Sequence, residues 1–484
     1  MMTTDARRTD VAIIGAGPAG MAAAVRLANA GLRPVVFDMA ATPGGQIYRQ
    51  LGDPQVGREI MGDDYSRGQH LLDAFARADI DYCPNSRVWW ASREDSNLSL
   101  GVLADGYTQR WDVNRLILAS GAMERGWPFP GWQLSGVMNA GAAQILLKQG
   151  ALLPSSAPVL AGSGPLLYLL AWQYLRAGRP PRLILDTSPA RRYASVLSQP
   201  WRAWQGRRYL IKGLHMISAL KRGGVLIHQG VDALQAHGDN DVERVEFRWH
   251  GEWHTEPADL LLTHFGVVPE PQLVRSLGIE HRWHTGQQCF VPQRGEDLVA
   301  KPNLWIAGDG GGIGGALNAE REGHLAALAL IEQSADASDT EKRKLLQARQ
   351  HDLAVRPVLE RLFRLPADWL VRQPDDTLVC RCESITRGAL DQAIRQGGAG
   401  PNQLKAFTRC GMGPCQGRQC GESVTRLLAA RLNEPCDAIG YYHIRPPVHS
   451  ITLGELTGLK GPHATTHKAT HQQKRCSTFI HNNK

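Results

Sequence analysis

The 484-residue sequence lacks the long apolar run that a membrane-spanning helix requires. Its longest apolar stretch, residues 166–175, is interrupted by Tyr168 and Gln173 and is shorter than the span of about 20 residues that crosses a bilayer. The first ten residues are polar and do not have the charged and then apolar layout of a signal peptide. We therefore expect a cytoplasmic protein with no transmembrane segment, for which peripheral membrane association stays open.

The sequence also lacks the signature of a nucleic-acid-binding protein. Its 54 Lys and Arg residues outnumber its 46 Asp and Glu residues and give a formal charge of +8, but they are scattered rather than clustered with aromatic residues. The densest basic stretch, residues 202–222, predicts a solvated helical face or a docking surface for an acidic partner. We expect no nucleic-acid partner.

A disulfide framework is not expected either. Five of the nine cysteines lie between Cys380 and Cys420, and in a chain without a signal peptide this is typical of metal ligands in a reducing compartment. Cys83 and Cys289 are isolated and are expected to be small buried side chains. No closely spaced cysteine pair lies near the motifs of the first 330 residues, which argues against a disulfide shuttle of the thioredoxin reductase type.

What the sequence does contain is ample material for folded cores. It is 43% hydrophobic and 21% charged, and its length is about three times the ~150 residues of a typical domain, so two or three domains are expected. The 51 glycines do not belong to a sequence repeat. They are therefore expected at positions where local geometry requires them.

A dinucleotide-binding motif opens the chain. Apolar residues 11–14 predict a buried strand, and Gly15-x-Gly17-x-x-Gly20 follows before an alanine-rich helical stretch. Gly15 allows the tight turn, Gly17 lets backbone approach a pyrophosphate, and Gly20 lets the helix pack against the strand. A second apolar strand ends at Asp38, whose carboxylate can accept hydrogen bonds from a ribose.

Three later segments indicate that this dinucleotide is FAD. Residues 44–46 follow the acid at the point where flavoproteins bring backbone close to the flavin. Residues 116–122 match the strand that returns the chain to an FAD domain. Residues 303–316 contain a further apolar strand that ends in Gly-Asp, which holds the ribityl and pyrophosphate portion of FAD in flavoproteins with two dinucleotide domains. The candidate FAD residues in these segments are Gly45, Gln46, Gly121, Gly308 and Asp309.

A second, defective motif follows. Gly162-x-Gly164 ends a predicted strand, and the next strand ends at Asp186, but Leu167 stands where the third glycine belongs. Two interpretations remain open. A working NAD(P) site would make the protein a reductase, whereas a retained domain would bind another nucleotide, such as ATP, or none. The missing glycine favours the second interpretation.

The cysteine-rich segment predicts an iron–sulfur site. Cys380-x-Cys382 and Cys415-x4-Cys420 are two ligand pairs separated by a helical stretch, as a four-thiolate site requires. Zinc usually prefers a two-residue gap within each pair, so the spacing favours a [2Fe–2S] cluster. We choose these four cysteines as the ligands and leave Cys410 as a neighbour. Because Cys410 and Cys415 have the same spacing as the chosen second pair, that alternative stays open.

These residues carry a family resemblance. Residues 380–383 and 408–420 resemble the bacterioferritin-associated-ferredoxin-type [2Fe–2S] domain. Together with segments within residues 121–144 and residues 445–455, they resemble the alpha-type subunit of heteromeric FAD-dependent amino-acid dehydrogenases. Members of that family are the opine oxidase A subunit, the hydrogen cyanide synthase B subunit, and the alpha subunits of D-hydroxyproline and dye-linked L-proline dehydrogenases. The resemblance covers about residues 8–460.

The expected fold class is α/β, with two Rossmann-like dinucleotide-binding domains of the pyridine nucleotide-disulfide reductase type and a small C-terminal helical [2Fe–2S] domain. The expected divisions are a discontinuous FAD-binding domain (8–125 and 268–335), a second nucleotide-binding domain (126–267), a helical connection (336–375), the [2Fe–2S] domain (376–430), a C-terminal wrap (431–461) and a disordered tail (462–484).

The resemblance implies a division of labour between subunits. A D-amino-acid-oxidase-like flavoprotein beta subunit would bind the amino acid and remove hydride from its carbon–nitrogen bond. Electrons would then pass through the FAD and the [2Fe–2S] cluster of this chain to a quinone or another acceptor. A small ferredoxin-like subunit and an FMN at a subunit interface are further components to consider. No group of His, Lys or carboxylate side chains stands out near the flavin motifs, so no catalytic residue is assigned.

The sequence therefore predicts an electron-transfer subunit of an oxidoreductase acting on a secondary amine of the D-hydroxyproline or opine type. The alternatives are a self-sufficient NAD(P)H-dependent reductase, a component of a glycine-oxidising cyanide synthase, and a scaffold that holds nucleotides without turnover.

Overall fold

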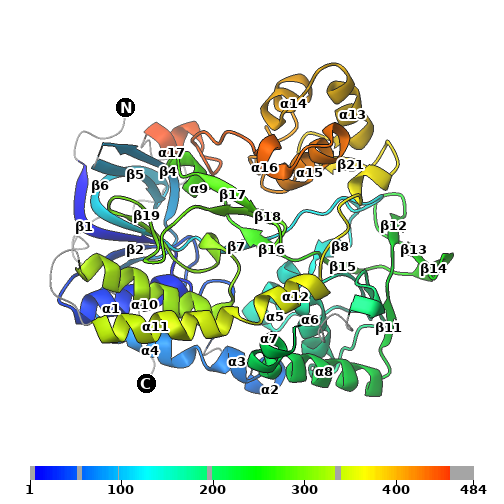
Figure 1. The fold of residues 1–484 in the computed structure, drawn as a ribbon, viewed down its shortest axis with the longest axis horizontal. Coiled ribbons are helices and arrows are strands. Elements are labelled where there is room, and N and C mark those ends of the chain that lie inside the picture. The colour runs from blue at the N-terminus through cyan, green and yellow to red at the C-terminus, as the bar shows by residue number, and fades with distance from the viewer. Residues whose placement is uncertain (1–5, 52–56, 96, 193–198, 333–338, 458–484) are drawn as a thin grey trace.

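The computed structural model describes residues 6–51, 57–95, 97–192, 199–332 and 339–457. Two sheets flanked by helices make up most of the molecule, and a smaller, mainly helical domain lies to one side (Figure 1). The predicted α/β fold class is thus confirmed. The predicted disordered tail lies outside the described residues.

The first sheet has eight strands, and its central strands are parallel. Strand β1 (Arg7–Ile14) lies between β2 (Val35–Phe37) and β6 (Tyr107–Leu118), and β20 (Leu304–Ile306) pairs with β6 on the other side. In register, Ile14 is level with both Phe37 and Leu118, and Leu118 is level with Ile306. All four strands therefore end at one edge of the sheet. The remaining strands are β3 (Asp81–Cys83), β4 (Arg87–Glu94), β5 (Asn97–Ala104) and β19 (Val299–Lys301).

Helices cover one face of this sheet. Helix α1 (Pro18–Asn29) packs against α10 (Ala316–Glu332), and α11 (Asp339–Leu353) lies beside α10 (Figure 1). The contact is close because α1 presents small side chains, including Ala22 and Ala23, to the core. Helix α4 (Gln69–Arg77) packs beside α1, and the short helices α2 (Arg58–Met61) and α3 (Asp63–Ser66) precede it.

The second sheet has five parallel strands. Their order is β11 (Leu226–Gln229), β10 (Leu183–Asp186), β9 (Val159–Gly162), β15 (Leu261–His264) and β8 (Val137–Asn139). Its helices are α5 (Ala140–Gly150), α6 (Pro165–Arg176), α7 (Pro200–Gln205) and α8 (Arg207–Arg222). An antiparallel sheet follows β11, formed by β12 (Ala233–His237), β13 (Arg244–Trp249) and β14 (Glu252–Pro257).

Two short antiparallel pairs connect the parts of the molecule. Strand β7 (Ala122–Glu124) pairs with β16 (Val267–Pro269), and β17 (His281–His284) pairs with β18 (Cys289–Pro292). The chain therefore leaves the first sheet at β7 and returns beside it at β16. Helix α9 (Gln272–Ser276) follows β16, and the 3-10 helix η2 (Gly308–Gly311) follows β20.

The C-terminal domain contains the cysteine-rich segment. After α12 (Arg356–Leu362) and the 3-10 helix η3 (Leu370–Arg372), a hairpin of β21 (Leu378–Cys380) and β22 (Ile385–Thr386) leads into four helices. These are α13 (Arg387–Arg395), α14 (Pro401–Thr408), α15 (Gly421–Leu432) and α16 (Cys436–Ile439). The chain then returns to the first sheet through α17 (Leu453–Thr457). No helix within the described residues is long and apolar enough to cross a membrane.

Candidate functional site

The first glycine motif lies where the parallel strands end. Gly15 follows β1, Asp38 follows β2, and residues 119–121 follow β6, so these segments meet at one edge of the sheet. Gly308 follows β20 at the same edge. Ligands of open parallel sheets bind at the carboxyl ends of the strands. The structure therefore brings together the segments that the sequence assigned to FAD.

Close backbone contacts form a cradle at this edge. A Cβ atom on Gly20 would lie 1.8 Å from the carbonyl oxygen of Gly15, so α1 can reach the strand only with glycine there. A Cβ on Gly45 would lie 2.8 Å from the Cα of Gly17, and the N–H of Gly44 donates to the carbonyl of Ala16 at 2.8 Å. The loop at residues 44–46 is thus packed on the glycine turn at residues 15–20.

The two acidic residues of the first site shape its loops. Asp38 accepts hydrogen bonds from the N–H of Ala16 at 2.5 Å and of Ala40 at 2.7 Å. Asp309 accepts from the N–H groups of Gly314 and Gly315 at 2.8 and 2.9 Å. Burial raises the pKa of both carboxyl groups. Each acid therefore holds the backbone around the cofactor position in addition to any contact with the cofactor.

The second glycine motif is covered by the protein's own side chains. The imidazole of His264 would lie 3.1 Å from a Cβ on Gly164, and its Nδ1 lies 2.7 Å from Glu124 Oε1. Ser163 donates to the carbonyl of Phe363 at 3.2 Å. Asp186, the acid at the end of the next strand, is fully buried and accepts hydrogen bonds from Tyr168 and from the Ser188 N–H. These groups occupy the surroundings of Gly162 and Gly164.

The cysteine domain brings five thiols together. The Sγ atoms of Cys380, Cys410 and Cys420 all lie within 4.8 Å of one another, and all three residues are buried. Cys382 and Cys415 form a separate hydrogen-bonded pair nearer the surface. The predicted ligands therefore fall into an inner pair and an outer pair. Cys410, set aside in the sequence analysis as a neighbour, lies within the inner group.

Aromatic and backbone contacts enclose the cysteines. The hydroxyl of Tyr442 lies 3.5 Å from Cys410 Sγ and 3.9 Å from Cys420 Sγ. A Cβ on Gly413 would lie 2.2 Å from the Cβ of Cys382, so the loop that carries Cys415 packs directly on the β21–β22 hairpin. The site is compact and lined by sulfur, as a thiolate-bound cluster requires.

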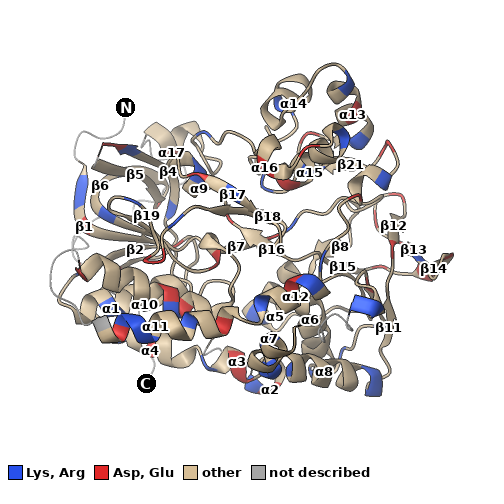
Figure 2. Cartoon of the chain, in the orientation of Figure 1, with Lys and Arg blue, Asp and Glu red and all other residues tan. Residues whose placement is uncertain are grey.

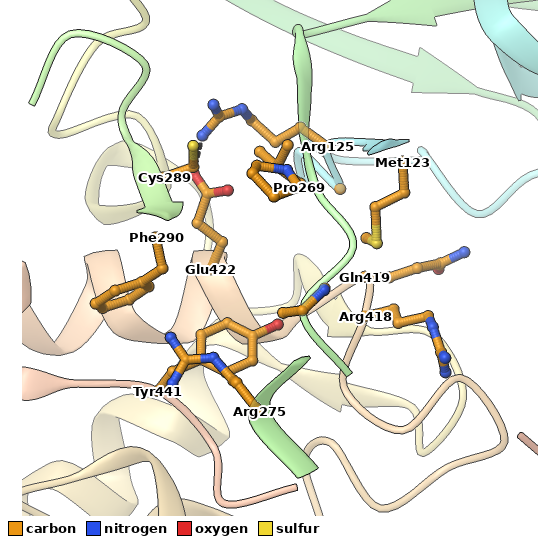
Figure 3. Close-up of a pocket in the computed structure, with 13 residues that line it drawn as sticks. Met123, Arg125, Pro269, Arg275, Cys289, Phe290, Arg418, Gln419, Glu422 and Tyr441 are labelled. Carbon is orange, nitrogen blue, oxygen red and sulfur yellow. Dashed lines mark ion pairs between the residues drawn. The ribbon is translucent and has the colours of Figure 1, made fainter. Parts of the chain in front are cut away.

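Buried charges fix the cysteine domain on the rest of the chain. Arg125, at the end of β7, forms an ion pair with Glu422 of α15, and Arg426 donates to the same carboxylate at 3.0 Å. Figure 3 shows Arg125 and Glu422 facing each other beside Cys289. Burial lowers the pKa of Arg125 to about 9 and that of Arg426 to about 10. Arg125 and Glu422 also line a cavity with a volume of about 20 Å³, room for roughly one water molecule.

A chain of direct contacts joins the two predicted cofactor sites. The N–H of Glu270 donates to the carbonyl of Gly121 at 3.1 Å, and the Glu270 carboxylate accepts from Arg418 at 2.9 Å. Arg418 also donates to the carbonyl of Cys415 at 3.3 Å. Glu270 and Arg418 thus link the segment at Gly121 to the outer cysteine pair.

Sequence reasoning missed a buried lysine beside the loop that contains Gln46. Lys148 of α5 donates hydrogen bonds to the carbonyls of Gln46 and Ile47 at 2.7 and 3.0 Å, and burial lowers its pKa to about 7. Gln46 in turn donates to the carbonyl of Ala122 at 3.2 Å. Because Lys148 lies about 100 residues from Gln46 in the sequence, no local pattern could place it here.

The residues present fit both cofactors implied by the sequence. At the first site, a Cβ on Gly17 would meet nothing nearer than the Cα of Gly45, at 3.9 Å, so the glycine turn presents bare backbone that the pyrophosphate of a dinucleotide can approach. At the cysteine site, the donor atoms are thiol sulfurs. Sulfur donors suit an iron–sulfur cluster, whereas hard cations prefer oxygen donors.

Comparison with known proteins agrees with this geometry. The family described as "Pyridine nucleotide-disulphide oxidoreductase" matches residues 9–323, and the "BFD-like [2Fe-2S] binding domain" matches residues 378–430. The chain is 39% identical over 468 residues to the opine oxidase A subunit of Agrobacterium tumefaciens (strain Ach5), covering 94% of this chain and 92% of the relative. It is 34% identical over 475 residues to the hydrogen cyanide synthase HcnB subunit of Pseudomonas aeruginosa, covering 92% and 98%.

Solved structures show the same fold. L-proline dehydrogenase from P. horikoshii superposes with a TM-score of 0.71 at 19% identity, over 93% of this chain and 80% of that one. Thioredoxin reductase from T. acidophilum superposes with a TM-score of 0.51 at 16% identity, over 68% of this chain and 99% of that one. The disulfide reductase fold therefore accounts for about two thirds of this chain.

The chain is thus an FAD-dependent oxidoreductase subunit with a [2Fe–2S] domain, and it belongs to the pyridine nucleotide-disulphide oxidoreductase family, in the group that includes the opine oxidase A subunit and the hydrogen cyanide synthase HcnB subunit.

Proposed function

We propose that this chain carries electrons from a partner subunit that oxidises a secondary amine, of the opine or D-hydroxyproline type, to an external acceptor such as a quinone. The observation that carries the proposal is the contact chain Gly121–Glu270–Arg418–Cys415, which holds the flavin segment and the outer cysteines in fixed proximity. FAD accepts two electrons and a [2Fe–2S] cluster accepts one, so this arrangement would convert hydride equivalents into single electrons.

We assign the cofactors to particular residues as part of this proposal. FAD is held by the first glycine motif with Asp38, the loop at residues 44–46, Gly121 and the Gly308–Asp309 turn, with the discontinuous domain boundaries given above. The cluster is held by an inner pair, Cys380 and Cys420, and an outer pair, Cys382 and Cys415. The exposure of Cys382 puts the outer pair on the side from which an acceptor can approach.

The substrate is assigned to the partner rather than to this chain. The cavity between β7, β16 and the cysteine domain has room for roughly one water molecule and not for an amino acid. Arg125 and Glu422, which line it, pair with each other, and Arg426 donates to the same carboxylate, so these groups serve as structural ties. The partner is a D-amino-acid-oxidase-like flavoprotein, and the complex is placed in the cytoplasm, where thiol ligands stay reduced.

The contacts around the second glycine motif argue against a self-sufficient NAD(P)H reductase. His264 packs over Gly164, and Asp186 is buried with its carboxylate already bonded. A nicotinamide dinucleotide would have to displace these groups to reach the turn. We propose that this domain does not serve as an entry point for electrons.

An anaerobic absorbance titration of the purified chain tests the proposal. NADH and NADPH should leave the flavin and cluster bands unchanged, and dithionite should bleach both. When the partner is bound, addition of a secondary amine substrate should bleach the flavin and then the cluster. Prompt bleaching of the flavin band by NADH or NADPH in the chain alone would contradict this proposal and support a self-sufficient NAD(P)H-dependent reductase.

A further inference from the structure

The five thiols of the cysteine domain are divided unequally. Cys382 and Cys415 form the outer pair, whereas three thiols, those of Cys380, Cys410 and Cys420, form the inner group. A [2Fe–2S] cluster takes four thiolates, two on each iron. The outer pair would supply one iron, and the inner group would offer three sulfurs for the two positions on the other.

Cys410 is placed as a ligand would be placed. It has no exposed surface, its Sγ lies within 4.8 Å of both Cys380 and Cys420, and it follows Arg409, which adopts a left-handed conformation with a φ of 66°. That turn ends α14 and directs Cys410 inward, and the Cys410 N–H donates to Thr408 Oγ1 at 3.2 Å. Cys410 is therefore held among the thiols by its backbone as well as by packing.

The other cysteines offer no such reserve to the outer pair. Cys436 lies beyond α15 and is not part of the thiol group, and Cys83 and Cys289 are buried elsewhere. Within the described residues, a spare thiol therefore lies beside one iron position only.

We propose that Cys410 is a reserve ligand of the inner iron, able to replace either Cys380 or Cys420 when that thiolate is lost. In the exchange, the bond from iron to the departing sulfur would break and a bond from iron to Cys410 Sγ would form. Cys410 gives up its thiol proton, the departing thiolate takes up a proton, and no electrons are transferred. The inference rests on the ligand assignment under the proposed function, but not on the identity of the electron donor.

Alanine variants of the holo-protein test the inference, because alanine offers no oxygen as a substitute ligand. We measure iron per chain, cluster absorbance and the EPR signal of the reduced cluster, with FAD content and circular dichroism as controls for folding. Cys420→Ala and Cys380→Ala should keep roughly half or more of the wild-type iron, whereas Cys382→Ala and Cys415→Ala should keep less than about a tenth. Cys410→Ala alone should keep its cluster.

Double variants distinguish replacement of a lost ligand by Cys410 from a cluster that simply survives the loss of one thiolate. Cys410→Ala/Cys420→Ala should lose the cluster and keep FAD, whereas the matched double variant Cys436→Ala/Cys420→Ala should keep both. Equal loss of iron in all four single ligand variants would overturn the inference. Loss of the cluster in Cys410→Ala alone would also overturn it, because Cys410 would then be a resident ligand. The nicotinamide titration does not depend on these results, so the two proposals can fail separately.

Discussion

Arg125 and Glu422 form a buried ion pair between the segment that leaves the first sheet and the first turn of α15 in the cysteine domain. The same carboxylate accepts a hydrogen bond from Arg426, whose guanidinium also lies over the rings of Trp127 and Trp283. Two buried cations thus share one anion. This carboxylate is the only acidic group bonded to both arginines among the described residues, so its loss would leave two buried cations without their anion.

Replacing Glu422 with glutamine should therefore be costly. Removal of one partner from a buried ion pair typically lowers the free energy of unfolding by about 3–5 kcal/mol, because the remaining charge is left uncompensated. The exposed pair Arg58–Asp63 is the matched control, and Asp63→Asn should leave the free energy of unfolding unchanged within error, because water screens an exposed pair. Urea unfolding followed by tryptophan fluorescence measures both. Equal effects of the two variants would show that Glu422 does not hold the interface.

Asp38→Ala should weaken FAD binding about tenfold or more, since the loss of two charge-assisted hydrogen bonds from backbone amides releases the loop that packs on the glycine turn. Titration of the apo-protein with FAD gives the dissociation constant. Asp79→Ala removes an exposed carboxylate near the same sheet and should leave that constant unchanged. Wild-type affinity in the Asp38 variant would contradict the assignment of this turn to the cofactor.

Much of the first site could be predicted from the sequence because its parts are local. A buried strand, a glycine turn and a helix are adjacent in the chain, and parallel strands necessarily bring Gly15, Asp38 and Gly308 to one edge. The cysteine spacing likewise placed four thiols in one domain. It could not separate Cys410 from the others, because spacing does not show which way a left-handed turn at Arg409 directs the next side chain.

Long-range contacts were beyond the sequence. Three contacts join segments that no sequence periodicity relates. They are the hydrogen bond of Lys148 to Gln46, the ion pair of Arg125 with Glu422, and the position of Tyr442 beside the thiols. Each of these side chains is buried and polar. The signal that could have found them is a charged or hydroxyl-bearing residue within an otherwise apolar element, such as Lys148 in α5.

The buried Lys148 should make stability depend on pH. Its pKa falls from 10.5 to about 7 on folding, so between these values the unfolded chain holds a proton that the folded chain does not. The free energy of unfolding should then rise with pH across this window, by up to about 1.4 kcal/mol for each unit. Lys148→Met should remove this contribution, so the melting temperature of the variant relative to wild type should be highest near pH 7 and fall toward pH 10.

The slope of that difference, rather than its absolute value, is the test. Lys148→Met also leaves the carbonyls of Gln46 and Ile47 without a donor, which lowers stability at every pH. Lys221→Met removes an exposed lysine of α8 and serves as the control, with no change in the pH profile. Parallel profiles for wild type and the Lys148 variant would show that this amine keeps its ordinary pKa in the folded protein.

The outer face of α7 and α8 is the surface that we expect to bind the partner subunit. Residues 200–222 contain six Lys and Arg residues and no Asp or Glu, and Figure 2 shows this basic charge along α8. Four large apolar side chains are exposed on the same two helices: Trp201 (70%), Trp204 (62%), Ile211 (62%) and Leu214 (65%). Exposed tryptophan beside basic charge is typical of the centre of a protein interface and costly to leave in water.

Trp201→Ala/Trp204→Ala should therefore weaken binding of the co-expressed partner subunit about tenfold or more, since buried tryptophans contribute most to such interfaces. FAD and iron content should stay at wild-type values, because these helices pack mainly against α6 and α12. Trp253→Ala removes a tryptophan that is 51% exposed on β14 and should leave binding unchanged. Surface plasmon resonance with the immobilised partner measures all three proteins. Wild-type affinity in the double variant would move the docking surface elsewhere, with the exposed side of the Cys382–Cys415 pair as the next surface to test.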